Sequence, residues 1–103
     1  MNAFLIDPAR RTIESVEFDG SLDAVRTLIG FPSIDADEIR GGTDRLFFDE
    51  ECFLRLDHEA GRFQLDALAP VSGRGVVTGP VTGNSVAAPS IDLDALRARV
   101  AFG

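Results

Sequence analysis

The chain has 103 residues, of which 45% are hydrophobic and 26% charged, which predicts one compact domain over residues 1–103 and argues against disorder. Its net charge of −7 disfavours binding to long nucleic acid, where affinity depends on neutralising phosphates, and the lack of any Lys excludes lysine chemistry. No apolar run approaches the ~20 residues of a membrane span, no charged leader opens the chain and a lone Cys52 excludes an intramolecular disulfide, so we expect a cytoplasmic protein without membrane contacts.

The first third of the sequence predicts a β-hairpin followed by a short helix. Residues 4–6 form an apolar run, Asp7-Pro8-Ala9-Arg10 is typical of a turn, and residues 12–18 place apolar and polar side chains on opposite faces, as a half-buried strand does. Ser21 is suited to cap a helix whose apolar residues recur at helical spacing. Gly30 stands where the left-handed residue after that helix belongs.

Several short strands and a closing helix are expected after Pro32. The strands are predicted at residues 33–39 (an edge strand), 45–48, 52–56, 62–65, 73–79 and 100–102. The glycines of residues 73–79 lead into a strand, not into the helix that a dinucleotide fingerprint needs, so we interpret them as turn residues. The second helix is expected to start at Pro89-Ser90. This order predicts the α+β class, with a mainly antiparallel sheet that the hairpin opens and two short helices packed on one face.

Acidic residues concentrate in the middle of the chain. Residues 35–59 hold nine acids and three Arg, a net charge of −6, whereas residues 60–103 hold three acids and four Arg, a net charge of +1. A solvated acidic surface that keeps the protein soluble is the simplest interpretation. A field of this sign also speeds encounter with a cationic protein, and the closing third is able to tolerate an anion.

The side chains available for catalysis and metal binding are few. The acids of residues 49–51 and 57–59 are interpreted as hairpin turns, because adjacent strand residues point to opposite faces and cannot converge on one ion, so we expect neither a metal nor a cofactor. His58 and Cys52 are the sole imidazole and the sole thiol, and an extended chain would hold them roughly 20 Å apart. Carboxylate chemistry stays open, but no pair is distinguished. We therefore expect a protein that is not an enzyme.

The last third supplies candidates for holding a small anionic ligand. Arg74 lies in a glycine turn, where its backbone N–H and its guanidinium are both able to face an anion. Asn84 lies in a turn from which it is able to read a base edge. Arg97 and Arg99 are separated by roughly 200° around the helix, so they cannot face one site in one subunit. Ordinary surface Arg residues and a simple turn remain the alternative interpretation.

The layout of the whole chain resembles small proteins common in phages and prophages. The similarity is carried by Ile6-Asp7-Pro8, Phe18-Asp19-Gly20-Ser21, Leu28-Ile29-Gly30, the acidic turn after Leu46-Phe47-Phe48, the Gly73–Gly79 strand and the segment from Leu93 to Phe102. Most members of such families have no assigned activity. Some resemble the phage proteins that defeat Thoeris immunity by sequestering a cyclic nucleotide signal between neighbouring subunits. That resemblance implies ligand-binding roles for Arg74, Asn84, Arg97 and Phe102.

We therefore expect a non-enzymatic binding protein that sequesters a cyclic nucleotide immune signal as a phage counter-defence. Arg would hold the phosphate and Phe would stack on the base. Because a chain of this size has limited room for a deep pocket, the site is expected between the subunits of a homo-oligomer. The alternative is an acidic interaction module that inhibits or regulates a host protein, for which the −6 block is the motivation.

Overall fold

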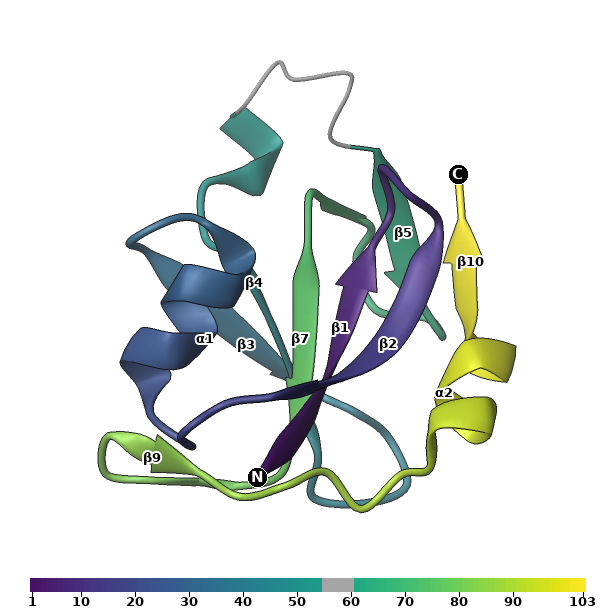
Figure 1. The fold of residues 1–103 in the computed structure, drawn as a ribbon. Coiled ribbons are helices and arrows are strands. Elements are labelled where there is room, and N and C mark those ends of the chain that lie inside the picture. The colour runs from purple at the N-terminus through teal and green to yellow at the C-terminus, as the bar shows by residue number, and fades with distance from the viewer. Residues whose placement is uncertain (55–60) are drawn as a thin grey trace.

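A computed structural model describes residues 1–54 and 61–103 (Figure 1). Its elements are β1 (Asn2–Asp7), β2 (Thr12–Glu17), α1 (Leu22–Ile29), β3 (Ile34–Glu38), β4 (Arg45–Asp49), the 3-10 helix η1 (Cys52–Leu54), β5 (Arg62–Leu65), β6 (Val71–Ser72), β7 (Gly75–Thr78), β8 (Val81–Thr82), β9 (Ser85–Val86), α2 (Leu93–Arg99) and β10 (Val100–Phe102). These elements confirm the predicted α+β class. None of the helices in the described part of the chain has the length and apolar character needed to cross a bilayer.

The main sheet has five strands in the order β2-β1-β7-β4-β3, and every neighbouring pair is antiparallel. The predicted hairpin of β1 and β2 is confirmed, with Asn2 opposite Glu17 and Asp7 opposite Thr12. β3 lies at the edge, as predicted. β7 is the central strand, and Figure 1 shows it between β1 and β4. Two smaller sheets, β10-β5-β6 and β8-β9, complete the strands of the described residues.

The sheet is covered on both faces, which corrects the expectation that both helices pack on one face. In β4, Leu46 and Phe48 belong to one buried cluster and Phe47 to the other, as alternation along a strand requires. α1 packs on the Phe47 face through Val25, whereas α2 packs on the opposite face through Leu96. Strands with consecutive buried residues need cover on each side, so the two helices are divided between the faces.

The first helix ends where the sequence predicts, but the second starts later. Ser21 Oγ accepts the Ala24 N–H of α1, and Gly30 follows the helix with φ 93°. The cap of α2 is Asp92, so the expected start at Pro89-Ser90 is wrong. The Ser90 N–H donates to the carboxylate of Asp44 at 2.9 Å and 3.0 Å, so Asp44 holds the segment that precedes the helix, and the helix begins after that segment.

The expected strand at residues 52–56 is also wrong within the described residues. Cys52–Leu54 form a 3-10 helix, since Asp49 Oδ1 accepts the Glu51 N–H at 3.1 Å and turns the chain immediately after β4. Residues 55 and 56 lie outside the described residues. So does His58, and the proposed separation of its imidazole from the Cys52 thiol stays a prediction.

Asp44 fixes the entry to α2. Its carboxylate is 3% exposed and accepts four hydrogen bonds, from the Ser90 N–H to both oxygens, from Ser90 Oγ at 3.0 Å and from the Ile91 N–H at 2.8 Å. Its own carbonyl accepts the Ile39 N–H at 3.0 Å. A buried carboxylate needs such partners. This one residue therefore joins the loop between β3 and β4 to a segment more than forty residues later in the sequence.

We predict that Gly75→Ala destabilises the protein by about 1–3 kcal/mol, because an added methyl group overpacks the core. A Cβ at Gly75 would lie 2.5 Å from Phe63 Cζ and 3.0 Å from Leu46 Cδ1. Gly42→Ala is the matched control, since its nearest neighbour would be Ser90 Oγ at 3.9 Å. Urea unfolding measures both variants. Equal stabilities for the two would contradict the packing argument.

A second prediction concerns the carboxylate of Asp44. Asp44→Ala removes every acceptor that the Ser90 and Ile91 donors use, so we expect a loss of about 3 kcal/mol in the free energy of unfolding. Asp92→Ala, which removes the single cap bond to the Ala95 N–H at 2.9 Å, is expected to cost about 1 kcal/mol. Thermal or urea unfolding compares the two, and an Asp44 effect no larger than the Asp92 effect would refute the prediction.

Candidate functional site

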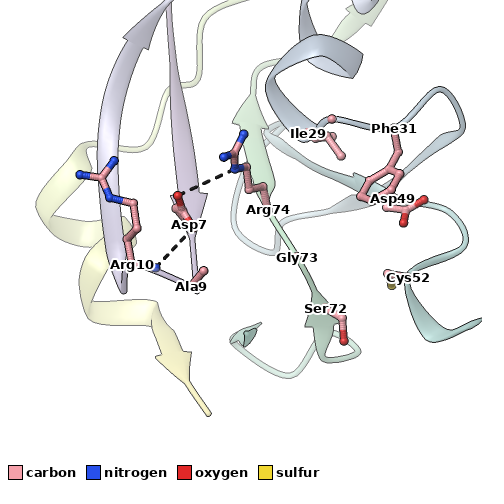
Figure 2. A pocket seen from close by; sticks show the side chains of 11 residues that line it. Asp7, Ala9, Arg10, Ile29, Phe31, Asp49, Cys52, Ser72, Gly73 and Arg74 are labelled. Atoms are coloured by element: carbon pink, nitrogen blue, oxygen red, sulfur yellow. Dashed lines mark hydrogen bonds and ion pairs between the residues drawn. The ribbon is translucent and has the colours of Figure 1, made fainter. Parts of the chain in front are cut away.

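A cavity of about 430 Å³ lies where three turns meet: the β1–β2 turn, the end of α1 and the turn between β6 and β7 (Figure 2). Its volume falls in the range of about 300–1,000 Å³ typical of small-molecule sites. Charged side chains of β1 and of the β6–β7 turn contribute to its lining, and so do apolar residues that follow α1 and β4. The cavity therefore has polar and apolar walls, as ligand sites commonly do.

Arg74 is the predicted site residue that lines this cavity. The turn is made by Gly73, whose φ of 86° is the left-handed conformation that glycine adopts most readily. The side chain of Arg74 is 50% exposed, and its Nη1 donates to the Leu28 carbonyl at 3.4 Å. Its Nε lies 3.8 Å from Asp7 Oδ2. Both contacts are long, and a guanidinium has five N–H groups, so donors remain for a ligand.

Asp7 faces Arg74 from the end of β1. Only 10% of its side chain is exposed, and its Oδ1 accepts the Arg10 N–H at 3.4 Å across the hairpin turn (Figure 2). A carboxylate accepts on two oxygens, and the contacts with Arg10 and Arg74 are both long. The Asp7 carboxylate therefore lies in the wall of the cavity with only long contacts. A hydrogen-bond donor on a ligand would improve its hydrogen bonding.

The other wall combines apolar side chains with one carboxylate. Ile29 and Phe31 come from the end of α1, and Cys52 from the start of η1, with its thiol 1% exposed. Figure 2 shows Phe31 and Cys52 on one side of the view and Asp7 on the other. Asp49 also lines the cavity, and its carboxylate caps the turn into η1.

The other three predicted site residues lie elsewhere in the subunit. Asn84 lies in the β8–β9 turn, where its carbonyl accepts the Leu22 N–H at 3.0 Å. Arg97 donates to the Ile13 carbonyl from Nη2 at 2.8 Å and from Nε at 3.3 Å. Phe102 lines a separate cavity of about 240 Å³. One subunit therefore does not bring these residues into the cavity that Arg74 lines.

Arg97 and Arg99 face different parts of the fold, as their helical spacing predicts. Arg99 Nε donates to both carboxylate oxygens of Asp66 at 3.0 Å, Nη2 donates to Asp66 Oδ2, and Nη2 also donates to the Arg40 carbonyl at 2.9 Å. These hydrogen bonds hold the pKa of the Asp66 carboxyl below its usual range and raise the pKa of Arg99. The pair fastens the end of α2 to the chain after β5.

Sequence reasoning misses Asp7 and Phe31 as site residues. The local pattern indicates Asp7 only as part of a turn, and Phe31 only as the residue at which α1 ends. The sequence around each of these two residues is that of an ordinary loop. They become neighbours of Arg74 because β1 pairs with β7 and α1 packs on the same sheet, which no local pattern states.

The chain has no match among protein-family models, curated proteins or solved structures. The assignment of a function therefore depends on the geometry of the cavity and on the chemistry of its residues. Within residues 1–54 and 61–103, no group of three or more His, Cys, Asp or Glu side chains is placed to hold a metal ion.

The Asp66–Arg99 pair predicts a pH dependence. Because the pKa of Asp66 is lowered in the folded state, its contribution is complete above the ordinary Asp pKa of about 4 and is lost as pH falls through the folded value. The free energy of unfolding of Asp66→Asn should therefore be lower than that of the wild type at pH 7. The difference between the two proteins should become smaller in acid. Glu50→Gln, at an exposed position, is the charge-matched control. Unfolding measured between about pH 7 and pH 2 tests this, and a constant deficit would exclude it.

Proposed function

We propose that this protein is a non-enzymatic binder that sequesters a nucleotide second messenger, and that the cavity between Asp7, Arg74 and Phe31 holds one nucleoside unit of it. The observation that carries the proposal is the Arg74 guanidinium, which is half exposed inside a cavity and makes only long contacts with the described residues. A guanidinium with donors available, in a cavity that Phe31 also lines, is well suited to a ligand that is both polar and planar.

The size of the cavity supports a small unit per subunit. A volume of about 430 Å³ lies toward the lower end of small-molecule sites. One nucleoside phosphate is a reasonable occupant, whereas a cyclic dinucleotide carries two such units and would need the cavities of two subunits. This is the basis for proposing a homo-oligomer. The proposed role in phage counter-defence depends on the resemblance of the sequence layout to phage proteins.

The absence of an enzymatic role is part of the same proposal. Of the cavity's carboxylates, Asp49 accepts the Glu51 N–H in the turn into η1, and Asp7 pairs with the guanidinium of Arg74, so the proposal assigns Asp49 to the structure and Asp7 to ligand binding. The Cys52 thiol is buried at 1% exposure, away from bulk solvent. Catalytic thiols usually lie in partly exposed, electropositive surroundings, so the position of Cys52 favours a structural thiol.

An acidic interaction module is the second candidate function, and one observation favours it. Phe53 is 63% exposed and Leu54 is 80% exposed on η1, directly after the exposed acid Glu50 and the exposed acid Glu51. Large apolar side chains beside charges are typical of protein contacts, where an aromatic anchor is surrounded by a polar rim. Binding to a cationic host protein that Phe53→Ser abolishes, while nucleotide binding persists, would support this second function.

We predict that isothermal titration with cyclic dinucleotides, cyclic ADP-ribose isomers and nucleoside monophosphates reveals at least one ligand. Arg74→Ala should weaken its affinity by about 10- to 100-fold, because a hydrogen bond from a charged donor is lost. Arg26→Ala is the matched control: it removes the same charge from a side chain that pairs with Asp23 on the surface of α1. The proposal fails if none of these compounds binds the wild-type protein. It also fails if Arg26→Ala weakens binding as much as Arg74→Ala.

A further inference from the structure

The Asp7–Arg74 pair presents two opposite hydrogen-bonding requirements side by side. The carboxylate of Asp7 only accepts, and the guanidinium of Arg74 only donates, with Nε and Oδ2 3.8 Å apart. At that separation, one ligand group is able to contact both side chains. A ligand that satisfies both must itself carry a donor next to an acceptor.

The charges of the pair disfavour a phosphate at this position. A phosphate gains attraction from Arg74 and suffers repulsion from Asp7 at a similar distance, so the two energies are of opposite sign and similar size. They nearly cancel, whereas the cost of removing water from the phosphate remains. A neutral group with a donor and an acceptor gains a hydrogen bond from each partner without repulsion.

We infer, on the basis of the proposed function, that Asp7 and Arg74 read the hydrogen-bonding edge of a nucleobase and that the phosphate of the ligand stays toward solvent. Nucleobases offer this pattern: an N–H donor beside an acceptor, such as the amino group and ring nitrogen of adenine or cytosine, or the N–H and carbonyl of guanine. The base plane lies toward Phe31, which supplies an aromatic surface on the apolar wall. This assigns to Arg74 a base contact where the sequence suggested a phosphate contact.

Two variants separate this inference from the proposed function. Asp7→Asn keeps the size of the side chain but removes its charge and replaces one acceptor oxygen with a donor. Arg74→Gln keeps a donor, and its half-exposed position makes loss of folding a minor concern. Asp23→Asn, whose side chain is 93% exposed on α1, is the control for loss of one negative charge. The probes are the four nucleoside monophosphates, ribose 5-phosphate and inorganic phosphate.

The inference predicts that the two kinds of probe respond differently to the variants. The best nucleoside monophosphate should bind wild type at least about tenfold more tightly than ribose 5-phosphate. Asp7→Asn should weaken that nucleotide by about tenfold or more and should strengthen ribose 5-phosphate and inorganic phosphate, because the repulsion is removed. Arg74→Gln should weaken both probes, because the attraction for the phosphate is lost, but it should weaken the nucleotide more, because the nucleotide also loses a hydrogen bond to its base. Asp23→Asn should leave the ratio of the two affinities as in wild type.

The outcomes that overturn the two claims differ. Base reading is refuted, and the proposed function stands, if a nucleotide binds but Asp7→Asn changes nucleotide and ribose 5-phosphate in parallel. The same holds if Arg74→Gln weakens ribose 5-phosphate as much as the nucleotide, because Arg74 then holds the phosphate. If no nucleoside monophosphate binds the wild-type protein, base reading fails, and the proposed function fails with it only if the cyclic dinucleotides and cyclic ADP-ribose isomers do not bind either. For variants that bind weakly, circular dichroism and the urea midpoint confirm that the fold is kept, so a change in affinity reports on the site.

Discussion

The fold depends on a central strand that is buried on both faces. All four residues of β7 are buried, and its neighbours β1 and β4 carry apolar side chains on each side of the sheet. A sheet of this kind cannot leave one face to water, so α1 has to cover one face and α2 with the β10-β5-β6 sheet the other. Gly75 lies close to Phe63, and its lack of a side chain lets the β10-β5-β6 sheet approach the central strand. The turn that carries Arg74 enters the sheet at this point.

Much of the secondary structure was predictable because it depends on local chemistry. The hairpin turn, the Ser21 cap and Gly30 at the end of α1 are side-chain and backbone preferences that act within a few residues. The errors have distant causes. The start of α2 is displaced by Asp44, which lies far from it in the sequence, and the placement of the helices follows from the faces to which the strands turn. Local propensity contains neither kind of information.

The candidate site shows the same division. Arg74 was recognisable as a guanidinium in a glycine turn, and this is the part of the site that sequence alone supplies. Asp7 and Phe31 were not, since their roles arise only when β1 lies beside β7 and α1 packs against the sheet. Asn84, Arg97 and Phe102 were chosen from residue type and resemblance. Within one subunit the Asn84 carbonyl accepts the Leu22 N–H, and Arg97 donates to the Ile13 carbonyl. Phe102 lines a second cavity.

The acidic edge of the main sheet has a consequence for how copies of this protein are able to meet. β3 leaves the backbone groups of its outer side without a strand partner among the described residues, a position from which sheets often grow into fibres. Asp35, Asp37 and Glu38 lie on this strand. If the β3 strands of two copies paired, carboxylates would face carboxylates, and their repulsion disfavours growth of the sheet through this edge. Contacts between copies of the protein are therefore less favourable at β3 than at uncharged parts of the surface.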